Sequence, residues 1–189
     1  MIVAIDGPAG SGKSTVAKMI AADLGFTFMN TGSFYRAMAL AVLRSLGGDE
    51  SGAGAEKPDL ENEAKWTDFA KTVSLEYKRD GMYLDGRCVE PYLRSDAVES
   101  IVAALSAIVP IRHLINKKIR AAAAKLNIVC EGRDMTTVVF PNAECKVYLD
   151  ASVDARTRRR FEQGTSSLSE AERPKNAHRS NRAASTTGI

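Results

Sequence analysis

Cysteine and histidine are scarce in this sequence of 189 residues, and the few that are present lie far apart. The three cysteines are Cys88, Cys130 and Cys145, which form no C-x-x-C pair, and the two histidines are His113 and His178. An odd number of widely spaced cysteines argues against a disulfide framework and favours reduced thiols in a reducing compartment. Two histidines at this distance do not predict a metal cluster.

Long hydrophobic runs are also missing. No apolar stretch approaches the ~18 residues that a membrane-spanning helix needs. The first six residues, Met1 to Asp6, contain no basic side chain and reach an acid at once, so we expect no signal peptide. Together with the cysteine usage, these absences predict a cytoplasmic protein that binds no membrane.

A strong charge of either sign is absent, because 26 Lys and Arg residues against 23 Asp and Glu residues leave a net charge of +3. So small a surplus is not by itself typical of a nucleic-acid-binding protein. The surplus is uneven, since residues 156–189 carry eight basic side chains and three glutamates. The remainder of the chain is therefore slightly acidic.

The length and the periodicity of the apolar residues predict one domain of α/β class. Short apolar runs predict buried strands of a parallel sheet at 2–5, 128–130 and 145–149. Between 73 and 89, alternating residues and two turn signals predict a small antiparallel meander. The expected helices span 13–24, 31–46 with Thr31 as the cap, 60–71, 94–126 with a break at Pro110, and 153–161.

A glycine-rich segment directly follows the first predicted strand and directly precedes the first predicted helix. It fits G-x-x-x-x-G-K-[ST], the P-loop pattern, whose glycines let successive backbone N–H groups converge on phosphate oxygens. The sequence therefore predicts a nucleoside triphosphate site. The residues expected to line it are Gly7, Pro8, Ala9, Gly10, Ser11, Gly12, Lys13, Ser14 and Thr15.

Two side chains of this loop have distinct expected roles. Lys13 reaches the terminal phosphates of the triphosphate, which we expect to be ATP, and the Ser14 hydroxyl ligates a Mg²⁺ ion that bridges them. Glu131 ends the second predicted strand, where an acid could order the water molecules around such an ion. ATP and Mg²⁺ are therefore the expected co-substrate and cofactor.

Two further segments suggest a second phosphate-binding site. Residues 30–36 (N-T-G-S-F-Y-R) place a hydroxyl and an aromatic–arginine pair at a helix start, although alone they would more often be an ordinary helix start. Residues 131–141 place two acids and an arginine at the carboxyl end of a buried strand, where open α/β sheets bind ligands. Arginine suits a phosphate because its planar fork contacts two oxygens at once.

Together, the segments G-P-A-G-S-G-K-S, T-G-S-F-Y-R and G-R-D-M-T-T-V-V-F-P resemble the bacterial cytidylate kinase family over residues 1–172. The resemblance implies a P-loop nucleoside monophosphate kinase fold, a parallel sheet flanked by helices with a small antiparallel insert. It implies transfer of the γ-phosphate of ATP to CMP or dCMP, an acceptor-binding insert at about 31–110 and a lid at about 156–172. We expect a monomer that binds no nucleic acid.

Carried over by motif position, the resemblance also implies roles for single residues. Thr31 and Arg36 would contact the acceptor nucleotide, and Arg112 and Arg133 would hold its phosphate. Asp134 would contact the cytosine or sugar side. Lys13 and Arg133 are the expected catalytic residues.

The sequence departs from the family after about residue 172. The family's acids, last strand and C-terminal helix have no counterpart in residues 173–189, so we expect an altered or out-of-frame tail whose composition fits disorder. The alternative is a different ending that leaves the fold intact. Three alternatives to an active cytidylate kinase therefore stay open: a disabled ATP-binding member of the family, a kinase of another small acceptor, and a triphosphate-binding module that contacts RNA through its basic segment.

Overall fold

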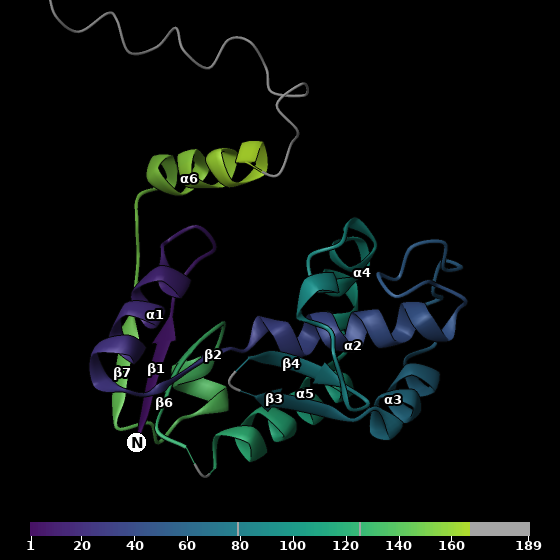
Figure 1. The fold of residues 1–189 in the computed structure, drawn as a ribbon, viewed down its shortest axis with the longest axis horizontal. Helices are drawn as coiled ribbons and strands as arrows, with labels where there is room; N and C mark the ends of the chain where they lie inside the picture. Colours follow the sequence, from purple (N-terminus) through teal and green to yellow (C-terminus); the bar gives the residue numbers. More distant parts are fainter. Residues whose placement is uncertain (79, 125, 167–189) are drawn as a thin grey trace, which may run out of the picture. The chain divides into compact units, whose positions relative to one another are not determined.

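The computed structural model describes residues 1–78, 80–124 and 126–166 (Figure 1). The predicted tail at 173–189 and the last part of the predicted lid lie outside these residues. The chain divides into two compact units, of which the first contains Met1–Pro8 and Gly12–Asp150. The second joins Ala9–Ser11 to the chain from Ala151 onward.

A parallel sheet forms the centre of the first unit, as the sequence predicts, and it has four strands where the sequence indicates three. Its strands are β1 (Ile2–Asp6), β2 (Thr27–Asn30), β6 (Ile128–Glu131) and β7 (Cys145–Tyr148), in the order β2-β6-β1-β7. All three neighbouring pairs run parallel. Because the strands share one direction, their carboxyl ends meet at one edge of the sheet. The sequence analysis does not predict β2, whose four residues, T-F-M-N, contain only two adjacent apolar side chains and do not alternate.

Helix α1 (Lys13–Leu24) packs on one face of this sheet (Figure 1). The face is lined by Val3, Ile5 and Val129, which bury Ala17 and Ala21 of the helix. The helix ends where predicted, since Gly25 adopts a left-handed conformation with φ of 64° that permits a C-cap.

A larger core covers the other face and continues into the rest of the unit. It contains residues of α2 (Gly32–Ser45), α3 (Glu63–Thr72), α4 (Asp96–Ala107) and α5 (Val109–Ala123). Helix α2 is buried on all sides from Ala37 to Leu43, whereas α4 and α5 bury residues at helical spacing. The two largest fully buried side chains, Trp66 and Phe34, belong to this core.

The predicted meander is present as an antiparallel sheet of β3 (Leu75–Lys78), β4 (Gly81–Leu84) and β5 (Arg87–Cys88). Met82 and Leu84 of its middle strand are buried in the larger core. The Tyr77 ring stacks on Phe34, with 5.8 Å between the ring centroids. The small antiparallel sheet is thus attached to α2 by shared apolar packing.

The predicted helical region from 94 to 126 is broken close to Pro110, because α4 ends at Ala107 and α5 begins at Val109. Among the described residues no single helix is long and apolar enough to cross a membrane. The α4 and α5 pair satisfies length and composition only with a bend of 102° between its members. Two short helical elements, η1 (Glu90–Tyr92) and the π-helix η2 (Met135–Val139), are not predicted.

Candidate active site

Three strand ends meet at one edge of the parallel sheet. The strand register pairs Glu131 of β6 with Asn30 of β2 and with Ile5 of β1. Asp6, the last residue of β1, therefore lies one residue beyond this level. Thr31 is the residue before α2, but its side chain does not cap that helix as we expected. Instead, the Thr31 hydroxyl donates to the backbone oxygen of Glu131 at 2.8 Å. This bond ties the start of α2 to the end of β6.

The predicted P-loop leads from β1 into α1, and its backbone has the conformations that glycine allows. Gly10 and Gly12 have φ of 79° and 99°, in the left-handed region that other residues rarely adopt. The Lys13 ammonium donates to the Pro8 backbone oxygen at 2.8 Å, and Thr15 lies exposed on the first turn of α1. The loop therefore begins a helix with its backbone N–H groups available to an anion.

The electrostatic surroundings of Lys13 combine burial with charges of both signs. Partial burial lowers the pKa of Lys13, Glu131 raises it, and the Arg133 charge lowers it again. An ammonium group on a glycine-rich loop of this kind suits the terminal oxygens of a nucleoside triphosphate.

The hydroxyl of Ser14 donates to Oε1 of Glu131 at 2.7 Å, and Glu131 is 7% exposed. A hydroxyl and a buried carboxylate are oxygen ligands of the kind that Mg²⁺ accepts together with phosphate oxygens and waters. No group of three or more His, Cys, Asp or Glu side chains among the described residues could hold a metal alone. The donor set therefore fits a Mg²⁺ ion that arrives with a phosphate ligand.

Within the second unit, residues 9–11 contact the start of α6 (Val153–Ser166), part of which is the predicted lid. The Arg159 guanidinium donates to the backbone oxygens of Gly10 at 3.3 Å and of Ser11 at 2.9 Å. A Cβ at Gly10 would lie 3.0 Å from the Arg156 backbone oxygen. The Ser11 hydroxyl is buried and has no hydrogen-bond partner among the described residues. It could therefore donate a hydrogen bond to a ligand oxygen.

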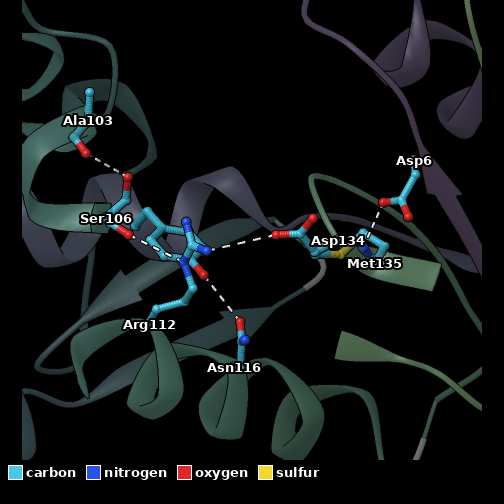
Figure 2. Close-up of polar contacts among 8 residues, drawn as sticks. Asp6, Ala103, Ser106, Arg112, Asn116, Asp134 and Met135 are labelled. Atoms are coloured by element: carbon cyan, nitrogen blue, oxygen red, sulfur yellow. Dashed lines mark hydrogen bonds and ion pairs between the residues drawn. The ribbon is translucent and has the colours of Figure 1, made fainter. Parts of the chain in front are cut away.

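Asp6 organises the turn that follows β6, and the sequence analysis does not single it out. Its carboxylate accepts the Met135 N–H at 2.6 Å, the Thr136 N–H at 2.9 Å and the Thr136 hydroxyl at 2.5 Å (Figure 2 shows the Met135 bond). These are the first N–H groups of η2, and Asp134 before them has a left-handed φ of 56°. The sequence signal that could have identified Asp6 is an acid at the end of a buried strand, because a buried carboxylate needs hydrogen-bond partners.

The same turn packs closely against the start of α2. A Cβ at Gly132 would overlap the Thr31 hydroxyl and lie 3.0 Å from the Met135 methyl group. Only glycine therefore allows β6 to approach Thr31 this closely. The predicted site residues Arg133 and Asp134, both exposed, follow directly from this fixed point.

Arg112 and Asp134 come together at the sheet edge (Figure 2). An Arg112 nitrogen, Nη1, lies 3.9 Å from Oδ2 of Asp134, and Nε donates to the Ser106 backbone oxygen at 3.3 Å. The Tyr35 hydroxyl donates to Oδ1 of the buried Asn116 at 3.1 Å. Burial raises the pKa of Tyr35, Arg112 lowers it, and Asp134 raises it.

The sequence analysis does not predict Asn116. It lies four residues after Arg112 on α5, a spacing that places both side chains on one face of the helix. Arg36, which is also predicted to contact the acceptor nucleotide, forms an ion pair with Glu99, with 2.8 Å between its Nε and Oε1 of the glutamate.

Two surface hollows lie elsewhere and contain none of these groups. The larger, of about 620 Å³, is lined from 57 to 63 and by α4, and the smaller, of about 360 Å³, by residues of 44–50 and 87–92. Neither hollow is lined by a residue of the P-loop or of the 132–136 turn. We therefore locate the candidate site by its chemistry at the strand ends.

A P-loop after the first strand of a parallel sheet, with a second set of arginines and acids at the same edge, defines the class of P-loop nucleoside monophosphate kinases. The family model described as cytidylate kinase matches residues 3–177. The chain belongs to the cytidylate kinase family.

Curated relatives agree with this assignment. The chain is 40% identical over 161 residues to the cytidylate kinase of Caldanaerobacter subterraneus subsp. tengcongensis, covering 85% of this chain and 67% of that one. It is 41% identical over 162 residues to the cytidylate kinase of Thermodesulfovibrio yellowstonii, covering 86% and 70%. It is 38% identical over 164 residues to the bifunctional pantoate ligase/cytidylate kinase of Prochlorococcus marinus, covering 84% and 30%.

Proposed function

We propose that this chain transfers the γ-phosphate of ATP to CMP and dCMP, which yields ADP with CDP or dCDP. Membership of the cytidylate kinase family supports the reaction, and ATP is the phosphate donor of such kinases. The observation that carries the proposal is the Ser14–Glu131 hydrogen bond of 2.7 Å beside Lys13, at the sheet edge that Thr31 and the 132–136 turn also reach.

The donor side of the proposed site is the P-loop. Backbone N–H groups of the loop surround the ATP phosphates, and Lys13 neutralises the terminal ones. Ser14 and Glu131 would hold a Mg²⁺ ion, directly or through its waters. Such an ion would supply positive charge that neutralises the phosphates.

The acceptor side of the proposed site comprises Thr31, Arg36, Arg112, Arg133 and Asp134. Arg112 is oriented by its bond to the Ser106 backbone oxygen and by its ion pair with Asp134. Arg133 lies in the 132–136 turn, just before the residues that Asp6 binds, and its charge acts on Lys13 of the P-loop. This position suits a side chain that contacts the transferred phosphoryl group, so Lys13 and Arg133 are the proposed catalytic residues.

The chain itself supplies position and charge and forms no covalent bond in this mechanism. It aligns the acceptor phosphate oxygen with the γ-phosphorus, and the arginines and Lys13 balance the phosphate charges. Residues at about 31–110 form the acceptor-binding insert, and those at about 156–172 form a lid that excludes water. The proposal includes a cytoplasmic monomer that binds neither nucleic acid nor a membrane.

An assay for ADP release with ATP, Mg²⁺ and one acceptor at a time tests the function. We expect rapid release with CMP and dCMP and slow release with UMP and AMP. A clear preference for AMP or UMP would contradict the acceptor assignment. Binding of ATP without release in the presence of any of the four would favour a disabled family member.

A further inference from the structure

One arginine of the proposed acceptor site is occupied by an acid of the chain itself. Arg36 lies on the second turn of α2, and Glu99 lies on the first turn of α4, which runs beside α2 (Figure 1). Their side chains form an ion pair with Nε and Oε1 2.8 Å apart. The Arg36 side chain is 24% exposed and that of Glu99 is 44% exposed, so solvent and ligands can reach the pair.

The guanidinium of Arg36 lies over the start of its own helix. A Cβ at Gly32 would lie 2.9 Å from Nη1 of Arg36 and 3.1 Å from Oδ1 of Asn30. Asn30 ends β2, and Thr31 follows it at the sheet edge. Arg36 therefore points back toward the strand ends, where an acceptor phosphate would lie, while its Nε is bound to Glu99.

A carboxylate and a phosphate monoester compete for the same donors of a guanidinium. Both prefer two parallel N–H bonds from the planar fork, and two anions on one fork repel each other. The Glu99 contact uses Nε, one of the donors from which such a bidentate pair is made. A phosphate that binds the Nη groups while Glu99 stays on Nε shares one guanidinium with a second anion, and their repulsion weakens its binding until the carboxylate withdraws.

We infer that Glu99 is an internal competitor of the acceptor phosphate at Arg36, and that it sets the affinity of the site for the nucleoside monophosphate. The inference rests on the proposed function, because it takes Arg36 as a phosphate ligand. Glu99 is a positioning residue that acts through Arg36 and weakens acceptor binding. Its partial exposure lets it turn into solvent when the phosphate arrives.

Steady-state kinetics of E99Q test the inference, with D96N as the matched control. Asp96 and Glu99 are both acids of the first turn of α4, so either substitution removes one negative charge from the same helix end. We expect E99Q to lower the KM for CMP about threefold, as suits an exposed ion pair, with kcat and the KM for ATP unchanged. D96N is expected to leave all three values unchanged.

A double-mutant cycle with Arg36→Gln separates competition from a general effect of charge. In the R36Q background, E99Q should no longer change the KM for CMP. If E99Q lowers this KM equally in both backgrounds, or D96N lowers it as much, Glu99 does not act through Arg36. A rise in the KM with E99Q would show that Glu99 holds Arg36 in its binding orientation, which overturns the inference.

Two controls keep these outcomes distinct. Thermal unfolding checks that E99Q is folded, and E99D, which keeps the charge but shortens its reach, should give a smaller decrease in KM. Failure of the wild-type chain to bind CMP in a calorimetric titration would contradict the proposed function itself. Normal CMP binding with an unchanged affinity in E99Q would contradict the inference alone.

Discussion

The two faces of the parallel sheet are packed very differently. Under α1, five described residues form the buried cluster, two of them alanines. On the opposite face, α2 and α5 belong to a core that continues through α3, α4 and the small sheet. The Lys13 and Ser14 side chains begin α1, whereas Tyr35, Arg36 and Arg112 extend from α2 and α5. The triphosphate side thus depends on the backbone of a loop, and the acceptor side on helices fixed by a large core.

The largest expected effect concerns the loop. Lys13→Ala should reduce ADP release at least about a thousandfold, because removal of a preorganised charge at a transferring phosphoryl group costs that order of rate. The fold should persist, since Lys13 contributes one bond to the Pro8 backbone oxygen. Lys18→Ala is the control, because Lys18 is an exposed lysine of the same helix. Wild-type turnover by K13A would remove Lys13 from the site.

Isoleucine truncations compare the two cores directly. Ile5 under α1 and Ile115 on α5 are both 0% exposed, so Ile→Ala removes the same group from each core. We expect a loss of about 4–5 kcal/mol of unfolding free energy at Ile115 and about 2–3 kcal/mol at Ile5, where the thin cluster can collapse around the cavity. Denaturant unfolding measures both. Equal losses, or a larger one at Ile5, would show that the two faces are equally rigid.

A smaller effect separates the two nucleotides. Arg133→Ala should raise the KM for CMP about 10- to 100-fold, as suits loss of a charge-assisted hydrogen bond, and the KM for ATP much less. Arg94→Ala serves as the control, because Arg94 is exposed before α4 and outside the proposed site. If both KM values rise equally in R133A, Arg133 does not belong to the acceptor side.

The smallest effect concerns the cysteines. Burial raises the pKa of the Cys130 thiol to about 12, so at pH 8 only about one molecule in 10⁴ carries the reactive thiolate. Cys88 is exposed. We expect alkylation of the native chain at Cys88 within minutes and at Cys130 only after unfolding, as mass spectrometry of the wild type and C88S would show.

The same shift has a consequence for stability. Unfolding returns the Cys130 thiol to its ordinary pKa of 9.0, so the unfolded chain loses this proton first as the pH rises. The contribution of Cys130 to stability is therefore complete below pH 9 and decreases between pH 9 and about 12. Native labelling of Cys130 at the rate of Cys88 would contradict the rigidity of the larger core.

The sequence predicts those parts of the fold whose signals are local. The apolar run of β1, the glycines of the loop and the helical spacing of α1 are complete within their own segments, and the structure confirms these elements. Strand β2 and η2 have weak local signals, because distant residues stabilise them. Strand β6 pairs with β2, and the Asp6 carboxylate binds the first N–H groups of η2.

The candidate site divides in the same way. Lys13 and Ser14 are recognisable from the loop pattern alone. Asn116 and Glu99 are not, since each gains its role from a partner at least 60 residues away, Tyr35 and Arg36 respectively. Polar partners that only tertiary packing brings together leave no periodic pattern, so their roles could not be predicted from the sequence.

Calorimetric titration of K13A with CMP, and separately with ATP and Mg²⁺, tests most directly whether different residues hold the two nucleotides. We expect CMP to bind K13A with the wild-type dissociation constant, because Arg36, Arg112 and Asp134 are held by α2, α5 and the 132–136 turn. ATP should bind far more weakly than to the wild type. An equal loss of CMP affinity in K13A would contradict separate donor and acceptor sites at this sheet edge.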